Sequence, residues 1–471
     1  MFAKLQRVHF VGIGGIGMSG ISEVLLNLGY KISGSDLRAS TITQRLAEAG
    51  AAIYEGHNAE NVRGAAVVVT SSAISPENPE VAEARKLHIP VIQRAEMLAE
   101  LMRLKYGIAV AGMHGKTTTT SMVAAVLAGG GLDPTVVVGG RVDALGSNAR
   151  LGKSQFLVAE ADESDRSFLM LSPILSVVTN IDREHMDCYK TMRHVKDAFL
   201  EFMDRVPFYG LVVACYDDPL LRRLLLQARR RVETYGMRKG AEFLVKPGKP
   251  SFSAGQNSLW NPFRISYRGQ DLGEFRLQVP GAHNVLNAAA AIAVGVALDV
   301  EIAKIRTALE NFRGVDRRFQ LRGKAAGVSV IDDYGHHPTE IRATLAAARQ
   351  CGFKKIHVIF QPHRYSRTRD LMDEFASAFG DADSLTVLDI YAASEPPIEG
   401  ITAETLAERI REQTKCAVHH ASWFEEAAAS AATAAEEGDM VLTLGAGSIS
   451  QLGPMILEKL GQRQPLKLSI E

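Results

Sequence analysis

The sequence predicts an α/β protein made of three doubly wound units, each with a mostly parallel sheet covered by helices. Apolar runs of strand length alternate with stretches of helical periodicity through most of its 471 residues. Two of the expected strands lead into glycine-rich turns, where α/β proteins commonly bind phosphates. The chain is also longer than a single hydrophobic core usually organises, and its length favours about three domains.

Composition indicates the class of protein, its partners and its compartment. Hydrophobic residues make up 46% of the chain and charged residues 23%, which is typical of a soluble globular protein. Lys plus Arg number 53, as do Asp plus Glu, so no long-range field favours nucleic acid or a membrane as partner. No C-x-x-C pair occurs among the four cysteines, and we expect a reducing, cytoplasmic location without a secretory signal. The cysteines are Cys188, Cys215, Cys351 and Cys416.

The first unit is expected over residues 1–106 as a Rossmann-like domain. Its strands are RVHFV, AAVVVTSS and PVIQ, each an apolar run suited to a buried strand. The helix after the first glycine turn carries an apolar stripe at helical spacing. The stripe consists of Met18, Ile21, Val24, Leu25 and Leu28.

The second unit is expected over residues 107–314. It begins with the strand GIAVA and a helix that runs to about Leu127, and three more strands are QFLVAE, LSVVTN and GLVVA. We expect KPGKPSFSAGQN to be a loop, because Gly, Pro and Ser dominate it. The alternating segment FRISYRGQDLGEFRLQVP predicts a hairpin, and a close-packed, Ala-rich helix follows from about Asn284.

The third unit, 315–471, repeats the alternation and is expected to be doubly wound again. Its strands are VSVIDDY, KKIHVIF, SLTVLDI and DMVLTLG, and a helix is predicted from Pro338 to Gln350. No internal sequence repeat is visible. The three units therefore share a design but differ in their glycine chemistry.

The first glycine turn resembles a dinucleotide fingerprint. Gly12, Gly14 and Gly17 spell G-x-G-x-x-G after a strand, and Asp36 closes the next strand, where a ribose-binding acid would sit. On these residues alone, an NAD-dependent oxidoreductase is one hypothesis.

The second glycine turn resembles a triphosphate loop. Gly112, Gly115, Lys116 and Thr117 follow a strand and precede a helix, although Val110 stands where the full motif has glycine. In this interpretation Lys116 contacts the β- and γ-phosphates of a nucleotide and the Thr117 hydroxyl binds Mg²⁺. An accidental Gly-Lys-Thr in a surface turn is the alternative.

Acidic residues follow two nearby strands. Glu160 ends a strand and is the best placed to hold a metal, with Asp162, Glu163 and Asp165 behind it. His185 comes five residues after another expected strand and is a metal or phosphate candidate. A solvated acidic loop and a structural histidine are the alternatives.

Three further groups are candidates for anion or ligand binding. Asn284 and Asn287 lie three apart at a helix start, where both amides can face one ligand or Asn284 can cap the helix. Arginines after strand ends or at a domain joint can grip phosphate or carboxylate, although solvated charge is the usual role of such runs. The polar groups are Arg313, Arg317 and Arg318; His363, Arg364, Arg367 and Arg369; and Asp332, Asp333, Tyr334, His336 and His337.

Taken together, the motifs resemble the ATP-dependent amide ligases of bacterial cell-wall precursor synthesis, the Mur ligases. The motifs occur in that family's order across nearly the whole chain, and the last two fit its alanine-adding branch. They are GIGGIGMSG with SGSD, GKTTTT, AEADESD, NIDREHMD, VPFYG, GAHNVLNA, RRF, DDYGHHPTE and QPHRYSRTRD.

The resemblance assigns a fold and a role to each unit. The first, Rossmann-like, would hold the UDP part of a sugar nucleotide, the second would bind ATP, and the third, also Rossmann-like, would close over the nucleotide. The substrate-binding residues would be Gly14, Gly15, Gly17, Asp36, Ser71, Ser72, His336 and Arg364. The ATP-binding residues would be Gly112, Met113, His114, Gly115, Lys116, Thr117, Thr118, Asn284, Asn287, Arg318 and Asp333, and Thr117, Glu160 and His185 would bind Mg²⁺.

The resemblance also implies a reaction. The lactyl carboxylate of UDP-N-acetylmuramate would take the γ-phosphoryl group of ATP, and the amine of L-alanine would attack the resulting acyl phosphate to give an amide, ADP and phosphate. Lys116, His185, Arg318, His336 and Arg364 would be the catalytic residues. The motifs do not show whether the protein is a monomer or a dimer.

The sequence departs from the family pattern at two points, and two other functions are alternatives to alanine addition. Met113 stands where the family usually has threonine, and the acidic group that replaces the carbamylated lysine of sister branches is not evident from the sequence. An ATPase that is not a ligase and a sister ligase for another amino acid or a recycled peptide are the alternatives to alanine addition.

Overall fold

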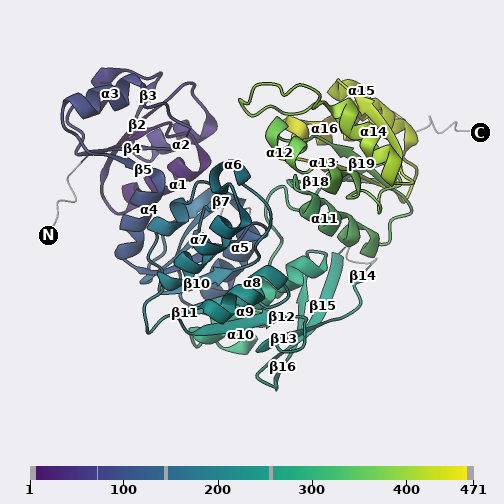
Figure 1. Ribbon diagram of the computed structural model, residues 1–471, viewed down its shortest axis with the longest axis horizontal. Coiled ribbons are helices and arrows are strands. Elements are labelled where there is room, and N and C mark those ends of the chain that lie inside the picture. The colour runs from purple at the N-terminus through teal and green to yellow at the C-terminus, as the bar shows by residue number, and fades with distance from the viewer. Residues whose placement is uncertain (1–6, 72, 143–146, 254–257, 464–471) are drawn as a thin grey trace, which may run out of the picture. The chain divides into compact units, whose positions relative to one another are not determined.

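The computed structural model describes residues 7–71, 73–142, 147–253 and 258–463. Within them the strands form three sheets that follow one another along the chain, which confirms the predicted fold class (Figure 1). Contacts divide the chain into two compact units. One comprises Met1–Pro247, Phe263–Arg276 and Val285–Arg313, and the other Gly248–Pro262, Leu277–Asn284 and Gly314–Glu471.

The first sheet is parallel, with strand order β3-β2-β1-β4-β5. Met18, Ile21, Val24 and Leu25 of the predicted apolar stripe are buried and pack the helix, α1, onto this sheet, whereas Leu28 follows the end of the helix and is only partly buried. The strands are β1 (Arg7–Val11), β2 (Lys31–Asp36), β3 (Ala52–Glu55), β4 (Val67–Thr70) and β5 (Val91–Gln93). The helices are α1 (Ile16–Asn27), α2 (Thr41–Glu48), η1 (Ala59–Val62), α3 (Pro79–Lys86) and α4 (Arg94–Arg103).

The second sheet follows the order β14-β15-β13-β12-β11-β10-β6-β9-β7-β8, with β16 paired to β15. It is parallel from β13 to β7 and antiparallel at both ends. The strands are β6 (Tyr106–Ala111), β7 (Thr135–Val142), β8 (Ser147–Arg150), β9 (Phe156–Glu160), β10 (Leu175–Val178), β11 (Leu211–Cys215), β12 (Val232–Gly236), β13 (Phe243–Pro247), β14 (Ser251–Ser253), β15 (Ser258–Tyr267) and β16 (Gln270–Leu277).

The antiparallel strands confirm one prediction and correct another. β15 and β16 form the predicted hairpin. The expected loop KPGKPSFSAGQN instead contains the end of β13 and all of β14, because both pair with β15, while residues 254–257 lie outside the described part. The helices that follow the strands of this sheet are α5 (Lys116–Gly129), η3 (Ser167–Met170), α6 (Met186–Tyr189), α7 (Met192–Asp204), α8 (Pro219–Leu224), η4 (Leu225–Gln227), α9 (Ala282–Ala297) and α10 (Ile302–Glu310).

The third sheet has the order β17-β18-β22-β19-β20-β21 and is parallel except for the antiparallel edge strand β17. Two separate apolar clusters cover it, as expected for a doubly wound sheet buried on both faces. The strands are β17 (Gln320–Ala325), β18 (Val328–Asp333), β19 (Ile356–Phe360), β20 (Ser384–Leu388), β21 (Ala417–Ala421) and β22 (Met440–Leu444). The helices are α11 (Pro338–Gln350), α12 (Tyr365–Asp370), α13 (Met372–Ala376), α14 (Ala403–Gln413), α15 (Phe424–Ala434), η5 (Ser448–Gln451) and α16 (Leu452–Gln462).

The helix starts differ in a way that bears on ligand binding. α11 begins where predicted, with Pro338 at its first position and a capping box between His337 and Glu340. By contrast, Gly15 precedes α1 and Gly115 precedes α5, and neither offers a side-chain cap. The first-turn N–H groups of a helix have no partner within the helix, so these two starts are suited to anions.

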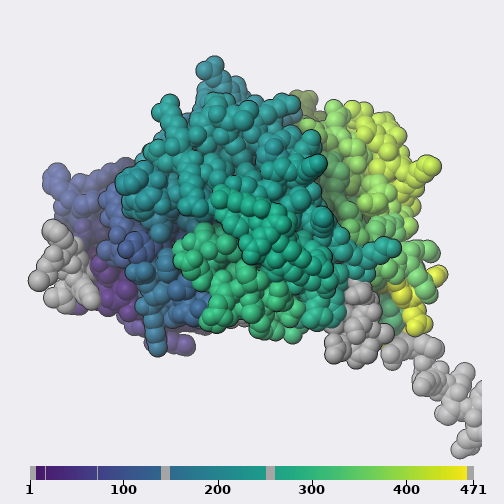
Figure 2. Space-filling model, turned by 90° about the horizontal axis from the view of Figure 1, so that it is seen from below, coloured from purple at the N-terminus to yellow at the C-terminus, as the bar shows by residue number. Residues whose placement is uncertain are grey.

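Within the unit that contains the first two sheets, α1 packs against β7 and β8, and α4 packs against η3 and β6. The blue and teal atoms of this unit meet in one continuous surface (Figure 2). The four cysteines are all free. None of the described helices combines the length and the apolar character that crossing a bilayer requires.

Candidate functional site

The first glycine turn is built around Asp36. The N–H of Gly14 donates to Asp36 Oδ2 over 2.8 Å, and a Cβ at Gly14 would lie 2.8 Å from the same oxygen. Gly12 has a φ of +79°, which favours glycine. The predicted strand-end acid and the fingerprint glycines therefore lie together, at the uncapped start of α1.

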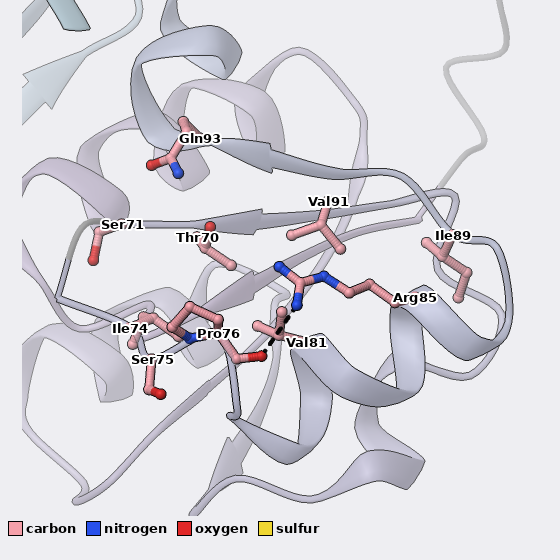
Figure 3. Close-up of a pocket in the computed structure, with 10 residues that line it drawn as sticks. All are labelled: Thr70, Ser71, Ile74, Ser75, Pro76, Val81, Arg85, Ile89, Val91 and Gln93. Carbon is pink, nitrogen blue, oxygen red and sulfur yellow. Dashed lines mark hydrogen bonds between the residues drawn. The ribbon is translucent and has the colours of Figure 1, made fainter. Parts of the chain in front are cut away.

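A groove lies beside this turn, at the carboxyl end of β4 (Figure 3). Its volume is about 490 Å³. Ser71, a predicted substrate-binding residue, lines the groove, and Ser72 lies outside the described residues. Ile74 also lines it and would lie 3.3 Å from a Cβ at Gly12, so the groove adjoins the glycine turn. The other lining residues are Thr70, Ser75, Pro76, Val81, Arg85, Ile89, Val91 and Gln93.

The second glycine turn is clamped by the end of β10. A Cβ at Gly112 would lie only 1.9 Å from Thr179 Oγ1, and Gly112 has a φ of +135°. The Thr179 hydroxyl donates to the His114 carbonyl, and the His114 N–H donates to Asn180 Oδ1. Gly115 then adopts a left-handed conformation with φ +80° as α5 starts. The first N–H groups of α5, including that of the buried Thr118, therefore begin directly after a fixed turn, and such groups at a helix start favour anions.

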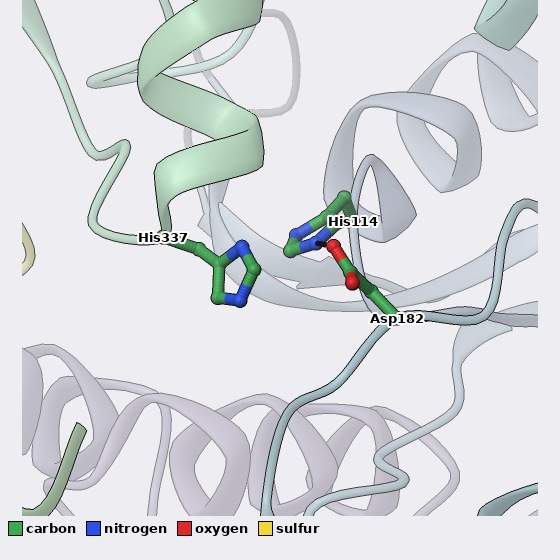
Figure 4. Close-up of side chains that lie close together, drawn as sticks. All are labelled: His114, Asp182 and His337. Carbon is green, nitrogen blue, oxygen red and sulfur yellow. Dashed lines mark hydrogen bonds and ion pairs between the residues drawn. The ribbon is translucent and has the colours of Figure 1, made fainter. Parts of the chain in front are cut away.

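The side chains of the turn are also held in place. His114 Nε2 lies 2.9 Å from Asp182 Oδ2 (Figure 4). Met113 is buried, and its carbonyl accepts a hydrogen bond from Lys116. Methionine at position 113 removes the hydroxyl of the usual threonine, but it leaves the backbone contact intact.

Lys116 makes an ion pair with Glu163. Its ammonium group lies 2.8 Å from Glu163 Oε1 and donates to the carbonyls of Gly112 and Met113. Burial lowers the pKa of Lys116, but the carboxylates of Glu163 and Glu160 outweigh burial and raise it above its ordinary value. Lys116 is therefore positively charged, as phosphate binding requires.

Thr117 and Glu160 meet at the end of β9. The Thr117 hydroxyl lies 3.1 and 3.0 Å from the two carboxylate oxygens of Glu160. A hydroxyl and a carboxylate at the start of a phosphate-binding helix are oxygen ligands of the kind that Mg²⁺ prefers. The two predicted metal ligands are thus brought together.

His185 faces the same cluster through Glu163. His185 Nε2 lies 3.6 Å from Glu163 Oε1, and His185 itself has a left-handed backbone with φ +56°. Glu163 is 2% exposed, and its Oε2 has no hydrogen-bond partner among the described residues. The Tyr189 hydroxyl donates to the Glu163 carbonyl and holds this residue in place.

The unpartnered Oε2 of Glu163 bears on whether this group of side chains fits a bound cation. A buried, ionised oxygen is costly unless it is paired or coordinates a metal, so the unpartnered Oε2 of Glu163, whose other oxygen lies 3.6 Å from His185, fits a divalent ion. Sequence reasoning ranked Glu163 only behind Glu160. A useful signal was available, because a lysine in a partly buried loop needs a nearby acid, and AEADESD offers four carboxylates directly after a strand.

The two asparagines of α9 have separate roles in the structure. Asn284 donates to the Pro280 carbonyl at the helix start. Asn287 accepts a hydrogen bond from Thr119 of α5, and its Oδ1 would lie 2.8 Å from a Cβ at Gly115. Asn287 therefore belongs to the phosphate-loop neighbourhood, and a shared ligand for both amides stays a prediction.

In the other unit, the Asp333 carboxylate at the end of β18 is held by backbone N–H groups. It accepts from the N–H groups of Phe319 and Gly335. Burial raises the pKa of Asp333, and the nearby charge of Arg318 opposes this effect. Arg318 lies over the Tyr334 ring at 5.1 Å and 3.6 Å from Glu340.

His336 and Arg364 lie in one neighbourhood of this unit. The His336 and His363 rings have centroids 5.9 Å apart, and Arg364 follows His363 directly. Arg364 has a strained φ of +74°, and its buried Nε lacks a hydrogen-bond partner among the described residues. Glu395 lies 4.0 Å from Arg364 Nη1. An unpartnered guanidinium nitrogen is suited to a small carboxylate.

These two glycine turns, the Lys116–Glu163–Glu160 cluster and the third sheet define an ATP-using ligase of the Mur type, and comparison with known proteins agrees. Family models match along the chain: "Mur ligase family, catalytic domain" at 7–106, "Mur ligase middle domain" at 110–295 and "Mur ligase, glutamate ligase domain" at 317–447. The chain belongs to the Mur ligase family, whose members use ATP.

Individual relatives indicate which branch of the Mur ligase family this chain resembles. The chain is 70% identical to a UDP-N-acetylmuramate–L-alanine ligase of Koribacter versatilis, over 98% of this chain and 99% of that protein. It is 64% identical to the same-named enzyme of Acidobacterium capsulatum, over 99% and 100% of the two chains. A crystal structure of UDP-N-acetylmuramate-alanine ligase from Thermotoga maritima is 30% identical, with a TM-score of 0.79 over 97% of this chain and all of that chain.

Proposed function

We propose that this protein joins L-alanine to the lactyl carboxylate of UDP-N-acetylmuramate at the expense of ATP, in the synthesis of peptidoglycan precursors. Identity of 70% over nearly the full length of a ligase with that activity carries the proposal. The geometry supports it independently, because two anion-binding helix starts and a charged phosphate-loop lysine lie in one compact unit.

Each glycine turn receives its own nucleotide in this proposal. The turn at Gly14, with Asp36 and Ser71, binds the diphosphate of the sugar nucleotide. The turn from Gly112 to Thr118 binds the phosphates of ATP, while Arg318, Asp333 and the α9 asparagines Asn284 and Asn287 bind the rest of it. The NAD interpretation of the first turn is less economical, since it leaves Lys116 and its carboxylate partners without a role.

The acidic cluster would hold Mg²⁺. Thr117 and Glu160 are the ligands of one ion, and His185 with Glu163 are the ligands we assign to a second. Mg²⁺ bound there would neutralise phosphate charge and polarise the γ-phosphoryl group. Glu163 thereby fills the role that sequence reasoning left without an acidic residue.

Lys116 is the central residue of the first chemical step. Carboxylate oxygen is a poor leaving group, so the substrate carboxylate must first take the γ-phosphoryl group. Charge on the transferring group grows toward the transition state, and the Lys116 ammonium, released from its carbonyl and Glu163 contacts, stabilises that charge. Arg318 would neutralise further phosphate charge.

The second step is assigned to the unit of the third sheet. Arg364 would bind the carboxylate of L-alanine, and His336 would orient its amine for attack on the acyl phosphate. The tetrahedral intermediate then expels phosphate and leaves the amide. Excluding water at this stage would protect the acyl phosphate from hydrolysis.

Phosphate release with each component omitted in turn tests the proposal. We expect release only when ATP, Mg²⁺, UDP-N-acetylmuramate and an amino acid are all present, with L-alanine preferred over serine and glycine. Equal release without the sugar nucleotide would identify an ATPase instead. Preference for a peptide or another amino acid would identify a sister ligase.

The metal assignment has its own test. Glu163→Gln keeps the shape of the side chain but removes the charge, and we expect a Mg²⁺ requirement raised about tenfold or more, together with a loss of turnover. Asp165→Asn is the matched control, because Asp165 lies two residues away and accepts from the Ser167 N–H instead. An unchanged Mg²⁺ titration in Glu163→Gln would remove Glu163 from the site.

A further inference from the structure

Arg94 lies between the two glycine turns. It is the first residue of α4, and its Nη2 lies 2.9 Å from Asp162 Oδ2 in the acidic loop after β9. On its other side, Nη1 would lie 2.4 Å from a Cβ at Gly17, in the first turn of α1. One guanidinium thus touches the turn assigned to the sugar nucleotide and the loop assigned to ATP and metal.

The contact with Gly17 depends on glycine. A side chain at position 17 would collide with Nη1 at 2.4 Å and with Cδ at 3.0 Å, so the Arg94 side chain would have to leave α1. A substitution at position 17 would therefore displace the flexible guanidinium of Arg94 rather than the helix, so this contact between Arg94 and α1 depends on glycine.

Asp162 links the position of Arg94 to the position of Lys116. Its Oδ1 accepts from both the N–H and the hydroxyl of Ser164, so the loop is a tight turn at this point. The next residue after Asp162 is Glu163, whose carboxylate is the ion-pair partner of Lys116. A shift of Asp162 by an ångström would move Glu163 and, with it, the ammonium group.

We propose that Arg94 is a positioning residue through which an occupied sugar-nucleotide turn orders the Asp162–Glu163 loop and the Lys116 ammonium. The inference rests on the proposed function and deepens it. Binding of the sugar-nucleotide diphosphate orders the start of α1, Arg94 packs against that start, and Asp162 follows Arg94. Ligand binding at one turn then favours nucleotide binding at the other, and by linkage the effect is mutual.

Ion pairing at this position is not expected to be a major source of stability. The Arg94 and Asp162 side chains are 27% and 40% exposed, and pairs that contact water contribute little to folding. The pair is therefore a contact that can be removed without unfolding the unit, and its loss can be read as a change in coupling.

The test measures coupling without turnover. The dissociation constant of a nonhydrolysable ATP analogue with Mg²⁺ is measured by calorimetry with and without saturating UDP-N-acetylmuramate. In the wild type we expect the sugar nucleotide to tighten analogue binding at least about fivefold, within the usual range of such couplings. In Arg94→Ala and in Asp162→Asn we expect this factor to fall below about twofold.

Matched variants separate coupling from general damage. Arg103→Ala removes another ion pair of the same helix, that with Glu100, and should keep the full coupling factor. The double variant of Arg94 and Asp162 should lose no more coupling than either single variant, because the two residues act as one link. Additive losses would overturn the inference.

The outcomes also distinguish this inference from the proposed function. A wild type that does not bind UDP-N-acetylmuramate contradicts the function itself. A wild type that binds both ligands without coupling, or an Arg94→Ala variant that keeps the wild-type factor, contradicts the role of Arg94 while leaving the function intact. UDP alone, which has the diphosphate but neither the amino sugar nor the lactyl carboxylate, should produce the coupling if the diphosphate is the group that acts.

Discussion

Lys116 and Glu163 form the charged pair at the centre of the proposed phosphate site. The ammonium group is held by Glu163 and by two carbonyls of its own loop, and in the proposed reaction phosphate oxygens would replace these contacts. The carboxylates keep the lysine charged despite its burial. Replacing Lys116 should therefore affect the chemical step more than ligand binding elsewhere.

Lys116→Ala is expected to lower kcat at least about a hundredfold, the scale of losing one strong transition-state charge contact. The dissociation constant of UDP-N-acetylmuramate should change by less than about threefold, because Gly14 and Asp36 lie on a different turn. Lys304→Ala, on the exposed pair with Glu301 in α10, is the control. Retention of more than half of the normal kcat would refute the phosphate-loop assignment.

Glu80 is a second buried charged residue, and its surroundings change the pKa of its carboxyl group. It is fully buried and accepts hydrogen bonds from Ser35 and Asn61, with His57 and His9 alongside. Burial by itself raises the pKa of Glu80, but the hydrogen bonds from His9, Ser35 and Asn61 outweigh it and lower the pKa from 4.5 to about 2. The folded protein thus prefers the charged carboxylate.

This shift predicts a pH dependence of stability. A carboxyl group whose pKa is lower in the folded state stabilises fully above its unfolded pKa, and the benefit disappears as the pH falls toward the folded value. Glu80→Gln should cost about 3 kcal/mol at pH 7. The difference from wild type in the urea unfolding midpoint should shrink between pH 4.5 and 2, whereas the exposed-site control Glu60→Gln should show little difference at any pH.

At the scale of elements, the two strand-turn-helix junctions form the two proposed nucleotide sites. Each places a glycine with positive φ after a buried strand and starts a helix without a side-chain cap. The second junction is the tighter, because the end of β10 packs directly against Gly112. Its geometry therefore tolerates less change than that of an ordinary turn.

Gly112→Ala tests this junction. Its Cβ would meet Thr179 Oγ1 at 1.9 Å and the Asn180 backbone nitrogen at 3.1 Å, so the turn must move. We expect a marked fall in Tm and loss of stabilisation by a Mg-ATP analogue. Gly131→Ala, just after α5, is the matched control, since it has a φ of +87° but nothing within 4 Å, and its cost should be only about 1 kcal/mol of backbone strain. Equal effects would mean that strain, rather than the contact with Thr179, limits position 112.

At the scale of the whole molecule, three sheets of similar design carry different chemistry. The first two offer anion sites at helix starts, and the third offers His336 and Arg364 near other polar side chains. Similar architecture therefore does not mean similar ligands, because the side chains at the strand ends decide what is bound. Ligand-induced stabilisation separates the possibilities.

UDP-N-acetylmuramate should raise the Tm, whereas NAD and NADP should not, when each is tested up to millimolar concentration. Gly14→Val should abolish the sugar-nucleotide effect, because its Cβ would lie 2.8 Å from Asp36 Oδ2 in the turn that takes the diphosphate. Stabilisation by the Mg-ATP analogue should persist in this variant. Stabilisation by micromolar NAD that Gly14→Val removes would instead favour an oxidoreductase.

Much of the fold was predictable because its signals are local. Strand RVHFV and helix Pro338–Gln350 occur where expected, since apolar periodicity and capping residues act within a few positions of one another. The antiparallel strand β14 was missed, because its partner β15 rather than its own Gly- and Pro-rich surroundings stabilises it. Pairing overrode local propensity in that segment.

The sequence by itself determined the alternation of strands and helices, the two glycine turns and the identity of Lys116, Thr117 and Glu160 as a group. The alternation and the turns depend on short spacings that physical chemistry constrains strongly, and Glu160, 43 residues from Thr117, follows from its place at the end of a strand. Only the tertiary structure decided which carboxylate pairs with Lys116, and that Arg94 meets Asp162, 68 residues away. Such contacts depend on how separate elements pack, and side-chain packing is set by the whole core rather than by any window of the chain.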